Sequence, residues 1–300
     1  GNISKIENFL NYLKKTGLKK EGKNISTNLD VTRVTDTLIV NNKIYIAYIE
    51  KKNKCNIIGI NSAEIELNFL KFDTFFRSEE CSNQGSPGRM QFYNHEEKDG
   101  ILLSTIQGGR DTPDSKVQDD NSIYGKILFI NLNTKDYSVF SKGHRAAQGL
   151  YAEKRLILST EHGPYGGDEI NKIIFKKNYG WPTASYGERY NFNYENKPFY
   201  KKNHKNFNFE EPIFSFTKGI GISELIRLPN NFSNFFQEYF IVTSLMDRSL
   251  YFTKFDDNFN KVLHYERVFL GERIRDIKYF NNFILLALEE NGELGILFPN

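Results

Sequence analysis

The amino-acid sequence predicts an all-β fold, and three observations support this class. Aromatic residues are frequent, with 26 Phe and 17 Tyr in 300 residues, and these side chains favour the pleated, half-buried surface of a sheet. After about residue 30, apolar and polar residues alternate with a period of two, which is typical of strands. Asn is abundant between these segments, and it tolerates the positive φ angles of tight turns.

The predicted strands fall into repeating sets. Residues 37–49 are predicted to form a hairpin around Asn41-Asn42, and residues 56–60 and 66–72 add two strands. Four strands in roughly 45 residues match one blade of a β-propeller. The last set, residues 274–298, is one strand short, so we expect the N-terminal region to supply the missing strand and protect the sheet edge. The further sets are predicted within residues 90–141, 148–175, 223–269 and 274–298.

The start of the chain has a different pattern. Apolar residues recur at helical spacing over residues 4–16, which predicts one short helix. Ser4 and Glu7 form a capping box at its start, and a basic run that reads as a solvated flank follows it. We therefore divide the chain into an N-terminal helix with its basic flank, residues 1–25, and a β-propeller domain, residues 26–300.

Charge and composition exclude some classes of partner. The chain has 40 basic and 37 acidic residues, a net charge of +3, and the signs are interspersed. A nucleic-acid surface would need clustered Lys and Arg, so we expect no nucleic-acid partner. No run of about 18 apolar residues exists, so we expect no membrane insertion, and no signal peptide is visible in the chain as given. The two cysteines, Cys55 and Cys81, fit either a structural disulfide or two buried thiols.

The segment Ser159–Asn171 contains a candidate cation site. Gly163-Pro164 follows an apolar strand, and this pair forces a turn that leaves two carbonyl oxygens outside the strand ladder. Backbone carbonyls are hard oxygen donors that suit Ca²⁺. Asp168 and Glu169 follow a second turn, where the alternative interpretation is that they cap backbone amides.

A second candidate site is the pair Arg273 and Arg275. Residues at i and i+2 of a strand face the same side, so the two guanidinium groups are presented together. Two such groups suit a ligand with several carboxylates or phosphates. The spacing alone favours the alternative, a structural salt-bridge cluster with Glu272 or Asp276.

Several of these segments together resemble one family. Gly143–Leu150 (GHRAAQGL) is followed by Glu161–Asn171 (EHGPYGGDEIN), Lys177–Pro182 (KNYGWP) and Arg273–Asp276 (RIRD). In this order the blocks are similar to those of the soluble aldose and glucose/sorbosone dehydrogenases, and the similarity runs from about residue 35 to the end. The resemblance implies a six-bladed propeller of four-stranded antiparallel blades, and a periplasmic or secreted location.

The resemblance also implies a function and a site. It implies oxidation of a sugar bound on the propeller axis, with pyrroloquinoline quinone (PQQ) and calcium as cofactors. The cofactor's carboxylates would meet arginines, and Ca²⁺ would be held by the carbonyls of a Gly-Pro pair. The residues that match cofactor contacts are Arg145, His162, Arg273 and Arg275, and those that match calcium ligands are Gly163 and Pro164.

Four positions depart from the family pattern. Gly85 occupies the position of the family's general-base His, so the catalytic residue is unknown. Ala146 replaces an amide and Met246 replaces a Lys, both of which contact the cofactor in the family. Gln107-Gly108 replaces a pair that ends in a substrate-side carboxylate. Loss of a general base alone costs a factor of about 10² to 10⁴ in rate.

Three functions are therefore compatible with the sequence. The first is an active quinone-dependent sugar dehydrogenase. The second is a non-catalytic propeller that keeps only the fold and binds a small axial ligand or a protein partner. The third is an enzyme whose base is another residue, such as His144 or His162.

Overall fold

The structure is a computed structural model of the 300-residue chain. The residues that it describes are 7–8, 26–52, 54–66, 68–107, 115–190 and 200–299. They fall into two compact units, one of residues 24–218 and the other of residues 219–300 together with the N-terminal 1–23. Each unit is described by itself.

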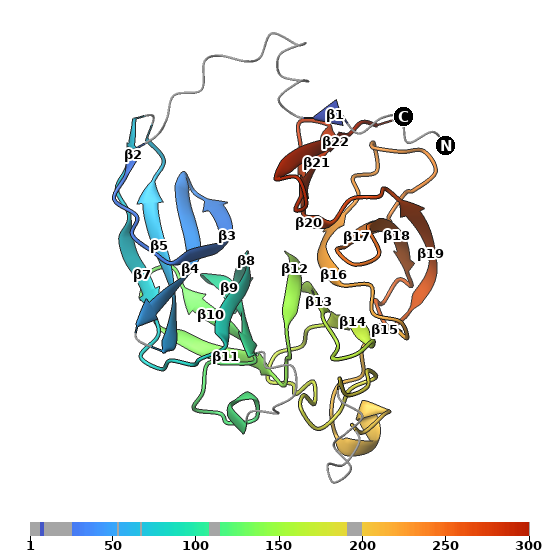
Figure 1. Ribbon diagram of the computed structural model, residues 1–300, viewed down its shortest axis with the longest axis horizontal. Helices are drawn as coiled ribbons and strands as arrows, with labels where there is room; N and C mark the ends of the chain where they lie inside the picture. Colours follow the sequence, from blue (N-terminus) through green and yellow to red (C-terminus); the bar gives the residue numbers. More distant parts are fainter. Residues whose placement is uncertain are drawn as a thin grey trace. The chain divides into compact units, whose positions relative to one another are not determined.

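The larger unit holds three four-stranded antiparallel sheets, a two-stranded parallel pair and two short 3-10 helices (Figure 1). Its elements are β2 (Ser26–Thr27), β3 (Arg33–Val40), β4 (Lys43–Lys52), β5 (Cys55–Glu64), β6 (Phe69–Leu70), β7 (Asp73–Arg77), β8 (Gly85–His95), β9 (Lys98–Gln107), η1 (Ser115–Val117), β10 (Lys126–Asn131), β11 (Tyr137–Lys142), β12 (Ala147–Glu153), β13 (Leu156–Glu161), β14 (Asp168–Lys172), η2 (His204–Phe207) and β15 (Phe214–Phe216). The sheet orders are β3-β4-β5-β7, β11-β10-β9-β8 and β12-β13-β14-β15, and β2 pairs with β6.

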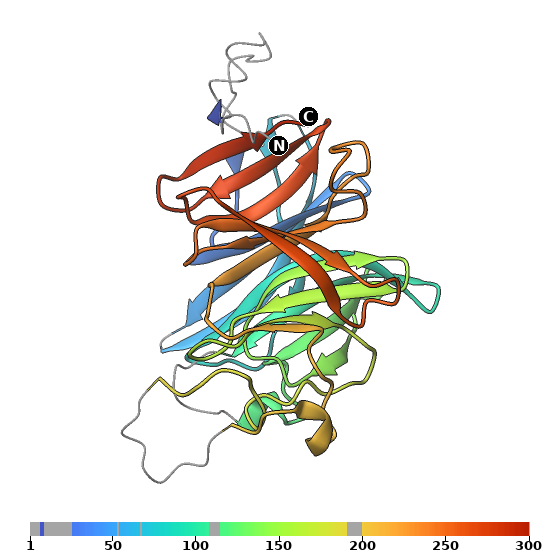
Figure 2. The same cartoon turned by 90° about the vertical axis from the view of Figure 1, so that its right-hand side faces the viewer.

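The smaller unit holds two more four-stranded antiparallel sheets, whose strands are strongly twisted (Figure 2). Its strands are β1 (Glu7–Asn8), β16 (Ile222–Arg227), β17 (Phe240–Ser244), β18 (Ser249–Phe255), β19 (Val262–Phe269), β20 (Ile274–Phe280), β21 (Phe283–Leu288) and β22 (Glu293–Leu297). The sheet orders are β16-β17-β18-β19 and β1-β22-β21-β20.

The N-terminal region completes the last sheet, as the sequence predicted. Glu7 pairs with Ile296 and Asn8 with Gly295, so β1 supplies the strand that the last predicted set lacks. These two residues are strand rather than helix, which corrects the predicted helix at that point. The rest of residues 4–16 lies outside the described residues, and the domain boundary at residue 26 stays a prediction.

The all-β propeller class is confirmed, but the predicted number of blades is wrong. The described residues form five four-stranded sheets rather than six. The sixth blade was implied only by the resemblance, whereas the strand pattern itself contains five sets. The count from local periodicity was therefore the better guide, because each blade needs its own four strands.

Burial explains why the inner strands have nearly continuous apolar runs. Residues 126–130 of β10 are buried on both faces of the strand, because neighbouring sheets cover both sides. Side chains of the first sheet, such as Ile58 and Ile60, pack against Leu103 and Leu128 of the second sheet in one core cluster. By contrast, β19 at the edge of its sheet is mostly exposed.

Candidate functional site

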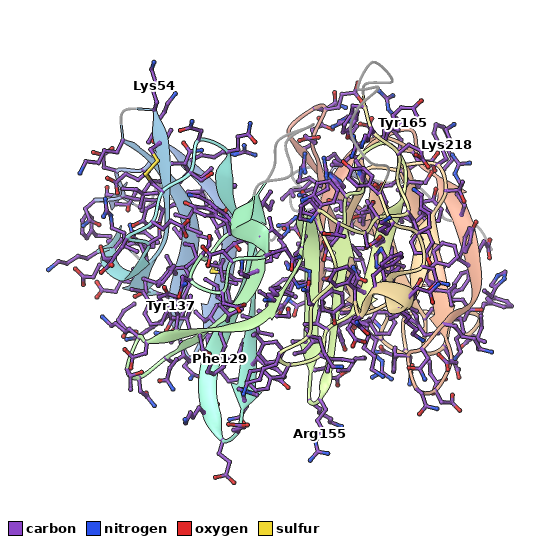
Figure 3. The ribbon with its side chains drawn as sticks, turned by 90° about the horizontal axis from the view of Figure 1, so that it is seen from below. Lys54, Phe129, Tyr137, Arg155, Tyr165 and Lys218 are labelled. Carbon is purple, nitrogen blue, oxygen red and sulfur yellow. A yellow bond between two sulfur atoms is a disulfide. The ribbon has the colours of Figure 1, made fainter. Side chains whose placement is uncertain are left out.

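The predicted calcium turn lies between β13 and β14 of the larger unit. The Gly163 N–H donates to Asp168 Oδ1 at 3.0 Å, which confirms that Asp168 caps a backbone amide. A side chain at Gly163 would overlap the carbonyl oxygen of Gly166, so glycine is required there. Within the described part of the chain, no hydrogen bond reaches the carbonyl oxygens of Gly163 and Pro164. The next residue, Tyr165, is 61% exposed (Figure 3), whereas Gly163 is half-buried and Pro164 is buried.

The cation would depend on backbone oxygens. Among the described residues, no group of three His, Cys, Asp or Glu side chains is arranged to hold a metal ion. Two uncommitted carbonyl oxygens in a rigid turn fit part of the oxygen shell of Ca²⁺, and the remaining ligands would come from a bound molecule and water.

Arg145 and His162 lie together beside this turn. Arg145 NH1 donates to the carbonyl oxygen of His162 at 3.1 Å, and the His162 N–H donates to the carbonyl oxygen of Ala146. The Arg145 guanidinium lies 5.3 Å from the centre of the Trp181 ring, a cation–π arrangement that holds it in place. Its buried Nε has no hydrogen-bond partner among the described residues. Arg145 therefore has a donor that a ligand oxygen can satisfy.

His144 does not qualify as a replacement base. It is fully buried, with Nδ1 2.5 Å from Glu161 Oε1 and Nε2 2.8 Å from Ser141 Oγ. Its ring stacks on Tyr179, with ring centres 4.7 Å apart. Both ring nitrogens are used inside the core, so His144 reaches no substrate and serves as a scaffold residue.

Behind the turn lies a group of carboxyl side chains. Burial, together with the negative charge of Glu161, raises the pKa of Glu169 to about 8. Asn171 Nδ2 lies 3.4 Å from one oxygen of Glu161 and 3.4 Å from one oxygen of Glu169. Glu169 is therefore mostly protonated at neutral pH, which avoids repulsion between neighbouring carboxylates.

Gly85, the position that the sequence resemblance assigns to a general base, lies against a tyrosine. A side chain at Gly85 would overlap the Tyr124 ring, and Tyr124 has no solvent exposure. The Tyr124 hydroxyl donates to the carbonyl oxygen of Asn56 at 3.1 Å, and burial raises the pKa of this phenol. Tyr124 therefore stays protonated, and its ring fills the space that a side chain at position 85 would need.

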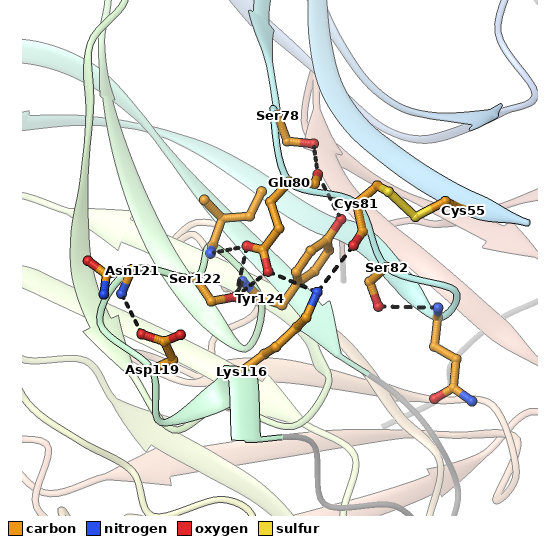
Figure 4. Close-up of polar contacts among 12 residues, drawn as sticks. Cys55, Ser78, Glu80, Cys81, Ser82, Lys116, Asp119, Asn121, Ser122 and Tyr124 are labelled. Carbon is orange, nitrogen blue, oxygen red and sulfur yellow. Dashed lines mark hydrogen bonds and ion pairs between the residues drawn. A yellow bond between two sulfur atoms is a disulfide. The ribbon is translucent and has the colours of Figure 1, made fainter.

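A polar network next to Tyr124 secures this arrangement (Figure 4). The Glu80 carboxylate accepts hydrogen bonds from Ser122 Oγ at 2.9 and 3.0 Å and from the Ile123 N–H at 3.0 Å. Lys116 Nζ lies 2.9 Å from Glu80 Oε1 and 3.2 Å from the carbonyl oxygen of Cys81. Cys81, whose carbonyl oxygen is part of this network, also forms a covalent bond to a residue of β5.

Cys55 and Cys81 form a disulfide, with an S–S distance of 2.05 Å and a Cα–Cα distance of 5.7 Å. The sequence left this question open, and the structure decides it. The bond ties the start of β5 to the segment that leads from β7 to Gly85 at the start of β8.

The arginine pair lies in the smaller unit and has a partner that the sequence did not reveal. Arg273 and Arg275 both donate to the carboxylate of Glu289, at distances of 2.5 to 3.1 Å. The structural salt-bridge cluster that the spacing favoured is therefore present, with Glu289 as a carboxylate partner that the sequence did not suggest, while Glu272 accepts from Asn291 and Asp276 lies 3.8 Å from Lys278 Nζ. Glu289 follows β21, and only the pairing of β20 with β21 brings it beside the arginines.

Two other positions at which the sequence departs from the family pattern, Met246 and Ala146, differ in their exposure to solvent. Met246, at the position where the resemblance predicts a Lys, is 63% exposed, and its N–H donates to the carbonyl oxygen of Ile220. Ala146, at the position where the resemblance predicts an amide, is buried. The side chain of Gln107 lies outside the described residues.

Repeated four-stranded antiparallel sheets of this kind define a β-propeller protein. The glucose/sorbosone dehydrogenase family model matches residues 29–297. The chain belongs to this family.

Known relatives are similar over part of their length. An uncharacterised protein of Synechocystis sp. is 28% identical over 183 residues, covering 60% of this chain and 43% of that protein. Aldose sugar dehydrogenase YliI of Escherichia coli is 29% identical over 206 residues, covering 66% of this chain and 52% of the enzyme. The chain thus spans about half the length of these two relatives, or less.

Solved structures show the same fold. A glucose dehydrogenase crystal structure gives a TM-score of 0.78 at 20% identity, covering 93% of this chain and 87% of that one. The apo form of the soluble aldose sugar dehydrogenase of E. coli gives 0.73 at 22% identity, covering 86% and 79%.

Proposed function

We propose that this chain oxidises an aldose sugar, with PQQ and Ca²⁺ as cofactors. The observation that carries the proposal is membership of the glucose/sorbosone dehydrogenase family over residues 29–297. A structural neighbour from Streptomyces coelicolor is described as the PQQ-bound form of an aldose sugar dehydrogenase, and it supports the choice of cofactor. The sugar itself is left open.

The residues of the chain fit parts of this role. Arg273 and Arg275 are suited to the carboxylates of an anionic cofactor, and Arg145 offers a buried donor. The carbonyls of Gly163 and Pro164 suit Ca²⁺, and His162 would lie against the cofactor. PQQ, when bound, supplies a two-electron acceptor for the hydride of the sugar. The task of the chain is then to bind and orient both molecules.

Proton removal is the part that the described residues do not fit. Gly85 has no side chain to accept a proton, and Tyr124 is protonated and buried beside it. Of the two alternative bases that the sequence suggests, His144 is enclosed, which leaves His162. We expect turnover well below that of an enzyme with a positioned base.

The packing of Tyr124 against Gly85 supports a second candidate, a non-catalytic propeller that binds a small axial ligand or a protein partner. It favours this candidate because the Tyr124 ring leaves no room at position 85 for a side chain that could act as a base.

No helix in the described ranges is long and apolar enough to cross a membrane.

We also propose a periplasmic or secreted location. The Cys55–Cys81 disulfide supports it, since such bonds persist mainly in oxidising compartments.

Calorimetric titration of the full chain with PQQ, with and without Ca²⁺, tests the function. A dye-linked assay with a panel of aldoses follows. Calcium-dependent binding with sugar-driven dye reduction supports the enzyme, and Arg273→Ala should then weaken binding. Binding without turnover supports the non-catalytic alternative. Absence of binding would show that PQQ is not the ligand.

A further inference from the structure

A single carboxylate holds both arginines of the candidate anion site. Glu289 Oε2 accepts from Arg273 Nε at 3.0 Å and NH2 at 2.9 Å, while Oε1 accepts from Arg275 Nε at 3.1 Å and NH2 at 2.5 Å. Each guanidinium therefore directs its Nε–NH2 edge at one Glu289 oxygen. This edge is one of those with which arginine binds a carboxylate through two parallel N–H donors.

Arg273 and Arg275 share the one carboxylate of Glu289. Arg248 and Arg267, by contrast, pair with separate carboxylates, those of Glu290 and Asp247. The three side chains are each 35 to 37% exposed, so a dissolved anion can reach them.

We propose that Glu289 is a built-in competitor for the arginine pair, and that a small organic carboxylate binds there by displacing the Glu289 side chain. The ligand class is a di- or tricarboxylate, because two guanidinium edges become available together when Glu289 leaves. The identification of the ligand as PQQ rests on the proposed function, whereas the competition by Glu289 does not. A different small polycarboxylate would use the same chemistry.

The competition has a measurable consequence. A ligand that must first displace Glu289 binds with an apparent affinity reduced by the fraction of time for which the site is open. Removing the charge of Glu289 should therefore tighten carboxylate binding. Since the lost contacts are charge-assisted hydrogen bonds, we expect a decrease in Kd of about 10-fold or more.

The test compares Glu289→Gln with a matched control, Glu290→Gln. Glu290 is the next residue, carries the same charge and pairs with Arg248 instead of the arginine pair. Isothermal titration calorimetry would measure binding of PQQ, and separately of pyridine-2,6-dicarboxylate without calcium. We expect Glu289→Gln to bind the dicarboxylate about 10-fold more tightly than wild type, and Glu290→Gln to match wild type. Equal tightening by both variants would show only a general charge effect and would overturn the proposal.

Unchanged or weaker binding by Glu289→Gln would also overturn it, and would show that Glu289 positions the arginines. If this variant fails to fold, Glu289→Asp provides the test, because its shorter side chain cannot bridge both arginines and should tighten binding to a smaller degree. Failure of the cofactor proposal gives a different result. In that case PQQ binds to no variant, while the dicarboxylate still binds more tightly to Glu289→Gln.

Discussion

At the scale of single residues, Gly85 shows how the absence of a side chain is required by the surrounding packing. Glycine at position 85 lets the Tyr124 ring pack against the backbone, and the Tyr124 hydroxyl is held by the carbonyl oxygen of Asn56. A histidine at this position would overlap the ring, so the packing excludes a larger residue here.

This packing predicts that Gly85→Ala destabilises the protein by about 1–3 kcal/mol, which is typical of overpacking in a core. Urea unfolding followed by circular dichroism measures the change. In a Tyr124→Leu background the cost should shrink, because the smaller side chain leaves room for the methyl group. An equal cost in both backgrounds would show that the ring is not the obstacle.

Glu169 predicts a pH dependence of stability. Its pKa is raised to about 8 in the folded state, whereas an unfolded Glu titrates near about 4.3. The folded state therefore holds one more proton between about pH 5 and 8, and stability should fall as pH rises through this window, by up to about 1.4 kcal/mol per unit. Glu169→Gln should remove this slope, as measured by unfolding at several pH values. The exposed Glu266→Gln control should retain it.

At the scale of elements, the disulfide and the Glu80 network hold the segment that enters β8. Cys81 and Glu80 are neighbours, and both are tied to other elements, Cys81 to β5 and Glu80 to residues 116–123. Gly85 begins β8 only four residues after Cys81. The position of the first residue of this strand therefore depends on a cross-link that lies outside the sheet.

Replacing both cysteines by serine should lower the free energy of unfolding by about 3 kcal/mol, because the bond closes a loop between residues 26 positions apart. Thermal unfolding of the variant and of chemically reduced wild type should show the same loss. If neither changes the melting temperature, the network around Glu80 alone is sufficient to hold the segment.

At the scale of the whole molecule, ligand binding should stabilise the folded chain. If PQQ with Ca²⁺ binds, a concentration 100 times the Kd should raise the free energy of unfolding by about 2.7 kcal/mol. Differential scanning fluorimetry detects this as a rise in melting temperature. Arg273→Ala should abolish the rise at the same ligand concentration, whereas Arg248→Ala, which removes an exposed arginine paired with Glu290, should preserve it.

Local patterns predicted most of the elements correctly. The turn at Asn41-Asn42 is confirmed, with φ angles of 48° and 62°, and the alternating segments became strands because side chains on opposite faces of a strand meet different environments. The motif Glu161–Asn171 likewise identified a turn with two uncommitted carbonyls in the described residues. These features depend on residues close together in the chain, so their sequence spacing carries the information.

Other features depend on residues that are distant in the chain. The pairing of Glu289 with Arg273 and Arg275 follows from the register of β20 against β21, and the contact of Gly85 with Tyr124 joins positions 39 residues apart. The state of Cys55 and Cys81 depended on whether folding brings them within bonding distance. The sequence alone therefore determined the all-β class, the five sets of strands and the turn motifs, while the tertiary structure decided the disulfide, the carboxylate partner of the arginines and the packing of Tyr124 on Gly85, because strand register and packing bring together residues that no local pattern connects.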